Sequence, residues 1–306
     1  MEWLLALTLL WGMLEEAAPP YNEALIAEAA RIEAVYQSLL EEETAMYASR
    51  EHAEQAISST WTAFPSEVHQ GDAFLLRAAE PQQIEWNDME IELIPFGTGY
   101  YAILPVPTDM KTGTYAIGEV EVNILAKSFK TQHLQVTEEQ EAMRRNTERI
   151  AADQVKVDAA RSQSEPRFLF DEPFALPTEG RRSTPFGFTR YINGKYSGSH
   201  RAIDIAAPQG TPILATAAGK VVLSEELYLT GNAIYIDHGM GLFSQYAHLY
   251  ELHVEAGDEV EAGQVIGLVG TTGFSTGPHL HLAFWLHGVQ VNPDQFIHSS
   301  PFLWLE

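Results

Sequence analysis

The sequence predicts a mainly β protein, with a C-terminal all-β domain and a small β-sandwich that is flanked by two helices. Three features support this fold class. From about residue 174 onward the chain is rich in Gly, Thr and Val and has no long helical pattern. Between residues 61 and 136, short apolar runs are interrupted by turn signals such as Gln70-Gly71. On either side of this segment, apolar residues recur at the three- and four-residue spacing of an amphipathic helix.

The composition limits the classes of function. The chain has 306 residues, enough for about two domains, and its 42 acidic and 18 basic residues give a formal net charge of -24. This charge has the wrong sign for binding a phosphate backbone, so the sequence predicts no nucleic-acid partner. The chain contains no cysteine, which excludes disulfides, a cysteine nucleophile and thiolate metal sites. Any metal must therefore bind His, Asp or Glu.

Residues 1–20 are predicted to be a signal peptide. The apolar run from Trp3 to Leu14 is much shorter than the roughly 20 residues that span a bilayer as a helix, so we expect no stable membrane span. Its length suits the apolar region of a secretory signal. Only Met1 and Glu2 precede it, without the usual Lys or Arg, and a buried N-terminal helical turn is the alternative. The prediction is an exported protein, periplasmic or extracellular.

The rest of the chain divides into four predicted segments. From Asn22 to Ser58 there is no Gly or Pro, and the polar face of this helical pattern is acidic. A solvated face is the plainer interpretation, and a docking surface for a cation or basic partner is the alternative. A second helix opens with the capping-box pair Thr137 and Gln140. The segments are an acidic amphipathic helix over 21–60, a β-sandwich module over 61–136, a linker helix over 137–165 and the all-β domain over 166–306.

The residues that could carry chemistry lie in this last domain. His200 and Asp204 are four residues apart at the start of a strand pattern, and His248 stands in a later run. His279 and His281 are two apart, so on a strand they would face the same side and could reach one metal. Each short pattern alone is close to a chance match. Their conjunction in one domain is what indicates a metal site.

Over about residues 167–297 the chain resembles the lysostaphin and LytM-like zinc metallopeptidases, which cleave peptide bonds in bacterial peptidoglycan. The order and spacing of many short motifs carry this resemblance. The β-module also looks like an amino-terminal domain that precedes this peptidase in some envelope proteins, from Gly71-Asp72 to Gln132. The matching motifs of the peptidase part include Thr184-Pro-Phe-Gly187, Arg190, Asn193-Gly194, His200 to Pro208, Ile236-Asp-His-Gly239, Tyr246-Ala-His-Leu249, Gly277 to His281 and Asn292-Pro293.

The resemblance implies a duplicated-hybrid-motif fold and a role for each site residue. His200, Asp204 and His281 would bind Zn²⁺, a set that suits tetrahedral coordination with an open fourth position. His248 and His279 would be the catalytic pair beside the reacting water, and the residues leave open which of them is the base. Two small departures from the family pattern, Ala202 for Gly and Phe243 for Tyr, remove no metal ligand; Leu282 and Ala283 stand where some members carry Glu.

The implied function is hydrolysis of cross-links between peptidoglycan stem peptides, with D,D-endopeptidase specificity, restrained by the N-terminal region. The alternative is a non-catalytic module of the same fold that binds the wall or activates another hydrolase, and a zinc assay separates the two. Arg190, Asn193 and Tyr246 are predicted to line the substrate groove, and core packing or turn capping is the alternative for them. A regulatory envelope protein is a further expected partner.

Overall fold

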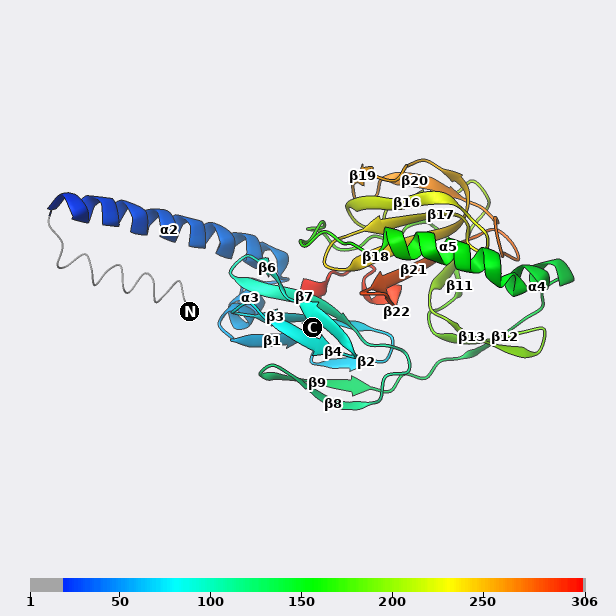
Figure 1. Ribbon diagram of the computed structural model, residues 1–306, viewed down its shortest axis with the longest axis horizontal. Helices are drawn as coiled ribbons and strands as arrows, with labels where there is room; N and C mark the ends of the chain where they lie inside the picture. The colour runs from blue at the N-terminus through cyan, green and yellow to red at the C-terminus, as the bar shows by residue number, and fades with distance from the viewer. Residues whose placement is uncertain (1–18, 305–306) are drawn as a thin grey trace. The chain divides into compact units, whose positions relative to one another are not determined.

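Strands dominate the regular structure of residues 19–304, the part of the chain that the computed structural model describes (Figure 1). The predicted mainly β fold class is thus confirmed. The predicted signal peptide lies outside the described residues, apart from Pro19 and Pro20. Within residues 19–304, no helix combines the length and the apolar character needed to cross a membrane. By their internal contacts the described residues form two units, one of residues up to Thr62 with Arg77–Tyr101, the other of Ala63–Leu76 and the residues from Ala102 onward.

In the first unit, the structure divides the predicted acidic helix in two. Helix α2 (Pro19–Met46) ends where Tyr47 is buried, and α3 (Arg50–Ile57) begins three residues later. Ser49 has an extended backbone with φ -151°, and its side chain accepts a hydrogen bond from the backbone N–H of His52. This N-cap satisfies one of the free donors at the start of α3 and so stabilises a new helix.

A buried ion pair holds the end of α2 inside the first unit. Glu43 and Arg77 are both almost fully buried, and Arg77 Nε lies 2.7 Å from Glu43 Oε1. The same carboxylate accepts hydrogen bonds from the hydroxyl of Tyr101 and from the backbone and side chain of Thr98. A buried charge pair needs such additional hydrogen bonds to offset its desolvation. The predicted acidic polar face is therefore not wholly solvated, because Glu43 is buried.

The strands of the first part of the chain are short, as the turn signals predict. In β4 and β5, Trp86 pairs with Met89 across a two-residue turn in which Asn87 and Asp88 both have positive φ, the geometry of a type I′ hairpin turn. β6 and β7 are likewise antiparallel. The bounds are β1 (Trp61–Phe64), β2 (Glu67–His69), β3 (Ala73–Ala78), β4 (Gln83–Trp86), β5 (Met89–Glu92), β6 (Ile94–Phe96), β7 (Gly99–Pro105), β8 (Gly113–Ile117), β9 (Val120–Leu125) and β10 (Thr131–Leu134).

The second unit contains a ten-stranded sheet and two three-stranded sheets. The large sheet has the order β11-β14-β21-β18-β17-β16-β19, with β15, β20 and β22 attached beside it. The small sheets have the orders β2-β9-β8 and β10-β12-β13. The remaining strands are β11 (Arg181–Thr184), β12 (Phe188–Ile192), β13 (Lys195–His200), β14 (Ile203–Ala206), β15 (Pro212–Leu214), β16 (Gly219–Leu227), β17 (Gly231–Asp237), β18 (Leu242–Leu252), β19 (Glu259–Val260), β20 (Val265–Val269), β21 (His279–Leu286) and β22 (Val289–Val291), followed by short 3₁₀ turns at Pro293–Gln295 and Pro301–Leu303.

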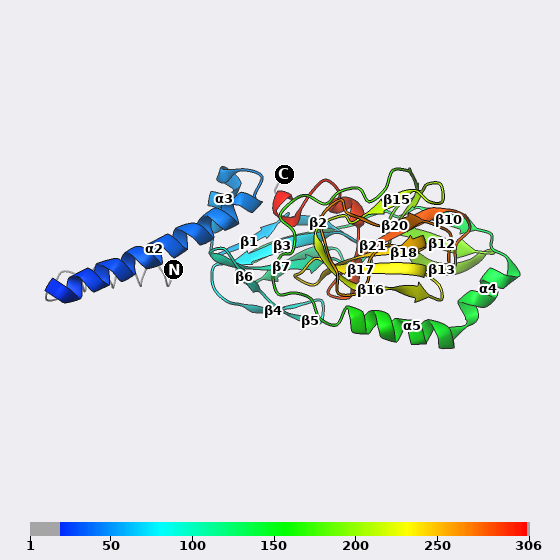
Figure 2. The ribbon, with the colours of Figure 1, turned by 90° about the horizontal axis from the view of Figure 1, so that it is seen from above.

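The predicted linker helix also consists of two helices, α4 (Glu138–Arg145) and α5 (Thr147–Ala160). The predicted capping box is confirmed, since Thr137 and Gln140 exchange both of its hydrogen bonds. Asn146 ends α4 with a non-helical backbone and caps α5 through its side chain, which explains the break. α5 packs beside β16 within the second unit, as both ribbon views show (Figure 2).

We expect a buried histidine to make the fold sensitive to acid. His238 is fully buried; its Nδ1–H donates to the carbonyl of Ala218, and its Nε2 lies 2.7 Å from Ser244 Oγ. Burial lowers the pKa of His238 to about 4. The unfolded chain binds this proton below about pH 6.5, whereas the folded chain resists it, so the stability contribution is complete above that pH and falls as the pH decreases towards 4.

Chemical denaturation between pH 7 and pH 4.5 measures this effect. Replacement of His238 by Gln should flatten the decline in unfolding free energy by about 2 kcal/mol over that range. H253Q, the same change at a partly exposed histidine, is the control for the substitution itself. Parallel curves for the unmodified chain and H238Q would contradict the prediction.

Candidate metal centre and groove

Two neighbouring strands of the large sheet bring the predicted ligands together. β14 and β21 are antiparallel, and their register places Asp204 opposite His281 and Ala206 opposite His279. His200 is the last residue of β13. The strand alternation therefore puts His279 and His281 on one face, as the sequence predicts, and brings Asp204 beside them.

Three potential ligand atoms form a small triangle. His200 Nε2 lies 3.2 Å from His281 Nδ1, and Asp204 Oδ1 lies 3.1 Å from the first of these nitrogens and 2.9 Å from the second. These three residues are the one group among residues 19–304 whose ligand atoms could hold a metal ion. His200 and Asp204 are buried, and His281 is partly accessible.

This triangle fits a tetrahedral metal ion. Ligand atoms at the usual Zn–N and Zn–O distances of about 2.0–2.2 Å are separated by roughly 3.3–3.6 Å in a tetrahedron, slightly more than the 2.9–3.2 Å seen here. Hydrogen bonding alone explains the arrangement poorly. If both imidazoles donate to the same carboxylate oxygen, two N–H groups face each other across 3.2 Å. A cation removes this conflict, because all three atoms can then present lone pairs.

The electrostatic environment keeps these groups in the state that a metal requires. Burial lowers the pKa of His200 to about 4, although its contact with Asp204 acts in the opposite direction. Burial raises the pKa of Asp204, but hydrogen bonds from His200 and His281 outweigh this and hold it well below its usual range. At neutral pH the site thus has an ionised carboxylate and a neutral imidazole, both suitable as ligands.

The predicted catalytic pair lies next to the triangle. The rings of His248 and His279 have centroids 4.8 Å apart, and His279 Nε2 is 3.8 Å from Asp204 Oδ1. Each Nδ1 lies 2.8 Å from a backbone carbonyl, that of Thr272 for His248 and that of Gly277 for His279. A carbonyl can only accept, so each Nδ1 carries a proton, and in the neutral ring the lone pair is on Nε2.

His248 is also held in an unusual backbone conformation. Its φ is +68°, in the left-handed region, and its backbone N–H donates to the carbonyl of Thr230. A non-glycine residue in this region typically costs about 1–3 kcal/mol, and such residues concentrate at functional sites. Burial lowers the pKa of His248 to about 3, so its ring is neutral at physiological pH.

Of the three predicted groove residues, Arg190 lies at the metal site. Its Nη2 donates to Asp204 Oδ2 at 3.1 Å, and its Nε donates to Gln132 Oε1 at 3.0 Å. Asn193 instead contacts the chain beyond β10, since its side chain exchanges hydrogen bonds with the backbone of Val136. These contacts leave the substrate role of Arg190 and Asn193 a prediction.

The prediction for Tyr246 needs correction. This side chain is fully buried, and its hydroxyl accepts a hydrogen bond from the backbone N–H of Thr216. It also lies 3.1 Å from Ser244 Oγ. The register of β17 with β18 shifts between the pairs Ile234–Tyr246 and Asn232–Leu249, and His248 lies in this bulge with φ +68°. The regular alternation of side chains is therefore broken between Tyr246 and His248, and the two need not face the same side. Tyr246 is a core residue rather than part of a groove.

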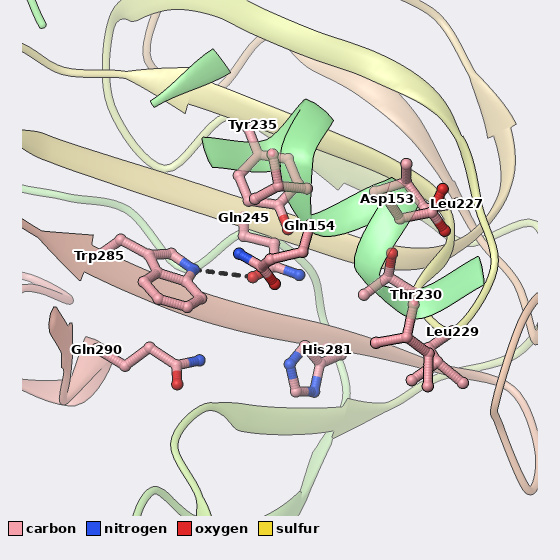
Figure 3. A pocket seen from close by; sticks show the side chains of 12 residues that line it. Asp153, Gln154, Leu227, Leu229, Thr230, Tyr235, Gln245, His281, Trp285 and Gln290 are labelled. Carbon is pink, nitrogen blue, oxygen red and sulfur yellow. Dashed lines mark hydrogen bonds between the residues drawn. The ribbon is translucent and has the colours of Figure 1, made fainter. Parts of the chain in front are cut away.

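A pocket of about 250 Å³ opens beside the metal site (Figure 3). His281 lies at one side of it, and Asp153 and Gln154 of α5 lie at another. Trp285 Nε1 donates to Gln245 Oε1 at 2.9 Å within the lining. The sequence did not indicate these residues as part of a site. Trp285 and Gln245 lie near His281 through strand alternation and the pairing of β18 with β21, whereas only the packing of α5 on the sheet brings Asp153 and Gln154 there.

A glutamine outside the predicted peptidase domain also reaches the site. Gln132 stands on β10, which pairs in parallel with β12, so that Gln132 lies opposite Arg190. Sequence reasoning gave it no role at the metal centre. A parallel pairing between distant segments has no local sequence signal, because its register depends on how the intervening chain folds.

The fold and the site together define a metallopeptidase domain. Residues 198–293, about a third of the chain, match the model of peptidase family M23, and this stretch contains the triangle that fits a Zn²⁺ ion. The predicted family resemblance is therefore confirmed. The match contains the three residues of the triangle and both histidines of the pair.

Similar proteins support this assignment. The chain is 43% identical over 123 residues to the DD-carboxypeptidase/endopeptidase Mpg of Neisseria meningitidis, covering 40% of this chain and 28% of that protein. It is 43% identical over 95 residues to the peptidoglycan DD-endopeptidase ShyC of Vibrio cholerae, covering 31% of this chain and 22% of that protein. The chain thus matches only about a quarter of the length of these curated relatives.

A solved structure extends the similarity beyond the peptidase domain. A Pseudomonas aeruginosa protein whose name places it with peptidase M23 has a TM-score of 0.59 and 25% sequence identity to this chain. The alignment covers 80% of this chain and 98% of that one. The likeness therefore includes residues ahead of the region that matches the family model.

Proposed function

We propose that this protein is a zinc-dependent endopeptidase that hydrolyses peptide cross-links of bacterial peptidoglycan, with D,D-endopeptidase specificity. The observation that carries the proposal is the triangle of His200, Asp204 and His281 beside a second pair of histidines. Two similar proteins are named for DD-endopeptidase activity, which supports the substrate class. An enzyme with this substrate acts outside the cytoplasm, in the periplasm or the extracellular space.

Each site residue has a distinct part in this activity. His200, Asp204 and His281 would hold Zn²⁺ through Nε2, Oδ1 and Nδ1. When bound, this ion polarises a carbonyl and acidifies water. In the neutral ring, His248 and His279 each present the lone pair of Nε2, so either can take the proton of the attacking water and later transfer it to the leaving amine. The other histidine, when its Nε2 carries a proton, can donate a hydrogen bond to the developing oxyanion.

Digestion of purified peptidoglycan tests the proposed substrate. Two wall types are compared, one with direct D-alanyl to diaminopimelate cross-links and one with glycine bridges, and the released fragments are analysed by mass spectrometry. We expect the cross-linked dimers of the first wall type to become monomers with a new D-alanyl carboxyl end. Cleavage confined to glycine bridges would reject the D,D assignment. Binding without cleavage by the zinc-loaded protein would favour the non-catalytic alternative.

The second part of the proposal is that α4 and α5 restrain the peptidase. Both helices contact segments that border the site. Gln140 of α4 donates to the backbone carbonyl of Ser275, four residues before His279. Asp153 of α5 accepts a hydrogen bond from the backbone N–H of Tyr228, and the helix lines the pocket that reaches His281 (Figure 3).

A small apolar cluster fixes α5 in this place. Val157 is buried among side chains of β16, β17 and β18, including Leu227 and Tyr235. The guanidinium of Arg161 lies 3.7 Å from the ring centroid of Trp285, in cation–π geometry. By contrast, Val155 on the outer face of the same helix is 69% exposed. The helix can therefore be released by a change at one buried position.

Replacement of Val157 by Asp should increase the rate of peptidoglycan hydrolysis by roughly threefold or more, because a buried carboxylate favours the state in which α5 has left the sheet. V155D is the matched control, with the same change on the exposed face, and should leave the rate unchanged. Limited proteolysis within 147–160 reports whether α5 is released. If α5 is released and peptidoglycan hydrolysis is no faster at equal zinc content, the proposed restraint is rejected. The region ahead of the peptidase is then better explained as a spacer or an oligomerisation arm.

An envelope protein that binds the N-terminal helices would be a natural regulator under this proposal. The basis is the acidic surface of α2, where residues such as Glu41 and Glu42 are exposed, while the chain as a whole carries a net charge of -24. A cationic partner is the chemistry that such a surface would recognise, and the interaction should weaken at high salt. Salt-dependent binding by full-length protein is the corresponding measurement.

A further inference from the structure

We propose that Gln132, which lies outside the region matched by the family model, is a positioning residue for the metal ligand Asp204 and acts through Arg190. The inference rests on the zinc site proposed above. It concerns how this chain fixes one carboxylate, and it makes β10 part of the peptidase machinery rather than of a preceding module.

The two oxygens of Asp204 have separate partners. Oδ1 faces His200 and His281, whereas Oδ2 accepts a hydrogen bond from Arg190 Nη2 at 3.1 Å. This division leaves only Oδ1 for the metal and fixes the rotation of the carboxylate. Hydrogen-bonded partners behind a metal ligand orient it and influence its affinity for the ion.

Arg190 is in turn held by Gln132. Gln132 Oε1 accepts a hydrogen bond from Arg190 Nε at 3.0 Å, and its Nε2 donates to Thr184 Oγ1 at 3.2 Å. Because the guanidinium of Arg190 can only donate, the amide oxygen of Gln132 must face it, and the amide nitrogen then faces Thr184. Thr184 lies opposite Asp204 in the pairing of β11 with β14. Gln132 therefore contacts both Arg190, which binds the Asp204 side chain, and Thr184, which pairs with Asp204 in the sheet.

Several contacts anchor the strand that carries Gln132. β10 pairs with β12 from Thr131 to Leu134, and the backbone N–H of Thr189 donates to the carbonyl of Lys130. Just before the strand, Phe129 packs against Gly187, where φ is +85° and a Cβ atom would lie 2.0 Å from the phenyl ring. Only glycine permits this approach. The position of Gln132 is thus set by backbone pairing on one side and aromatic packing on the other.

Arg190 is well suited to such a role. Its guanidinium is planar and permanently charged, and it presents several donors in a fixed geometry. One donor faces Asp204 and another faces Gln132, so removal of the amide acceptor frees the guanidinium to rotate. An uncompensated Nε–H in such a place carries a desolvation cost that a correctly placed amide oxygen relieves.

Competition with a fluorescent chelator tests the proposal through zinc affinity, independently of peptidoglycan hydrolysis. In the full chain, Q132A should weaken zinc binding about tenfold, the low end of the range for residues behind a metal ligand. Q132E keeps an acceptor of the same length for Arg190 Nε and should restore the affinity to within about threefold of the unmodified chain. Thermal unfolding of the zinc-free proteins reports whether each variant is folded.

The matched control is His133 on the same strand. It is exposed and stacks on Tyr191, with ring centroids 5.1 Å apart, so H133A disturbs β10 without reaching Arg190. We expect H133A to bind zinc as the unmodified chain does. Equal losses in Q132A, Q132E and H133A would assign the effect to the strand as a whole and overturn the proposal, as would unchanged affinity in folded Q132A. Neither outcome depends on which cross-link the enzyme cleaves.

Discussion

Replacement of His281 by Ala should remove both the bound zinc and the peptidase activity. His281 supplies one corner of the triangle, with Nδ1 only 2.9 Å from Asp204 Oδ1, and two remaining ligands cannot hold the ion against dilution. We expect zinc to fall from one ion per chain to nearly none, and the rate of cross-link hydrolysis to fall by roughly a thousandfold or more. Elemental analysis after gel filtration and fragment analysis measure the two quantities.

Metal removal from the unmodified chain should give the same result reversibly. Treatment with a chelator is expected to abolish hydrolysis, and added Zn²⁺ should restore it. H253A is a suitable control, since His253 is partly exposed and contacts Glu251. An H281A protein that keeps a full equivalent of zinc would show that the metal is held elsewhere and would reject the assigned ligand set.

Replacement of either histidine of the catalytic pair should separate activity from metal binding. We expect H248N and H279A to lower kcat by about 10²–10⁴-fold, the usual contribution of a general acid–base group, while zinc content stays near one per chain. Asn is chosen at position 248 because it tolerates the left-handed conformation that His248 adopts, with φ +68°. The two rings occupy neighbouring positions, with centroids 4.8 Å apart, but neither belongs to the triangle.

The pH dependence of the two variants distinguishes their roles. Loss of the base should remove the acidic limb of the kcat/KM profile, whereas loss of the group that stabilises the oxyanion should lower the rate at every pH. Zinc content is measured on the same samples. If H248N lost zinc to the same extent as H281A, His248 would have to be counted among the ligands.

Much of the site could be predicted because its residues follow short-range rules. His279 and His281 share a face because side chains two apart on a strand point the same way. The capping box at Thr137 and Gln140 is likewise a local pattern, and it formed as predicted. The order of motifs around His200 and Asp204 indicated the peptidase family, which the match over residues 198–293 confirms.

Other features escaped prediction because they depend on long-range packing. Tyr246 lies two residues before His248 and was therefore predicted to line the groove. The irregular pairing of β17 with β18 instead places its side chain in the core. Ser49 and Asn146 interrupt helices whose apolar spacing continues across them, because capping and tertiary contacts outweigh helix propensity there. The acidic row of α2 includes Glu43, whose buried pairing with Arg77 could not be distinguished from a solvated face by periodicity alone.

The sequence by itself determined the chemistry of this protein: an acidic, cysteine-free chain in which metal binding falls to histidine and aspartate, arranged in the spacing of an M23 peptidase. The tertiary structure alone decided what surrounds that chemistry. It brought Gln132 to Arg190 and Asp204, and it placed α5 beside the pocket at His281. The reason is physical: a strand's alternation is fixed by its backbone geometry, whereas the pairing of segments far apart in the chain is fixed only when the whole unit has folded.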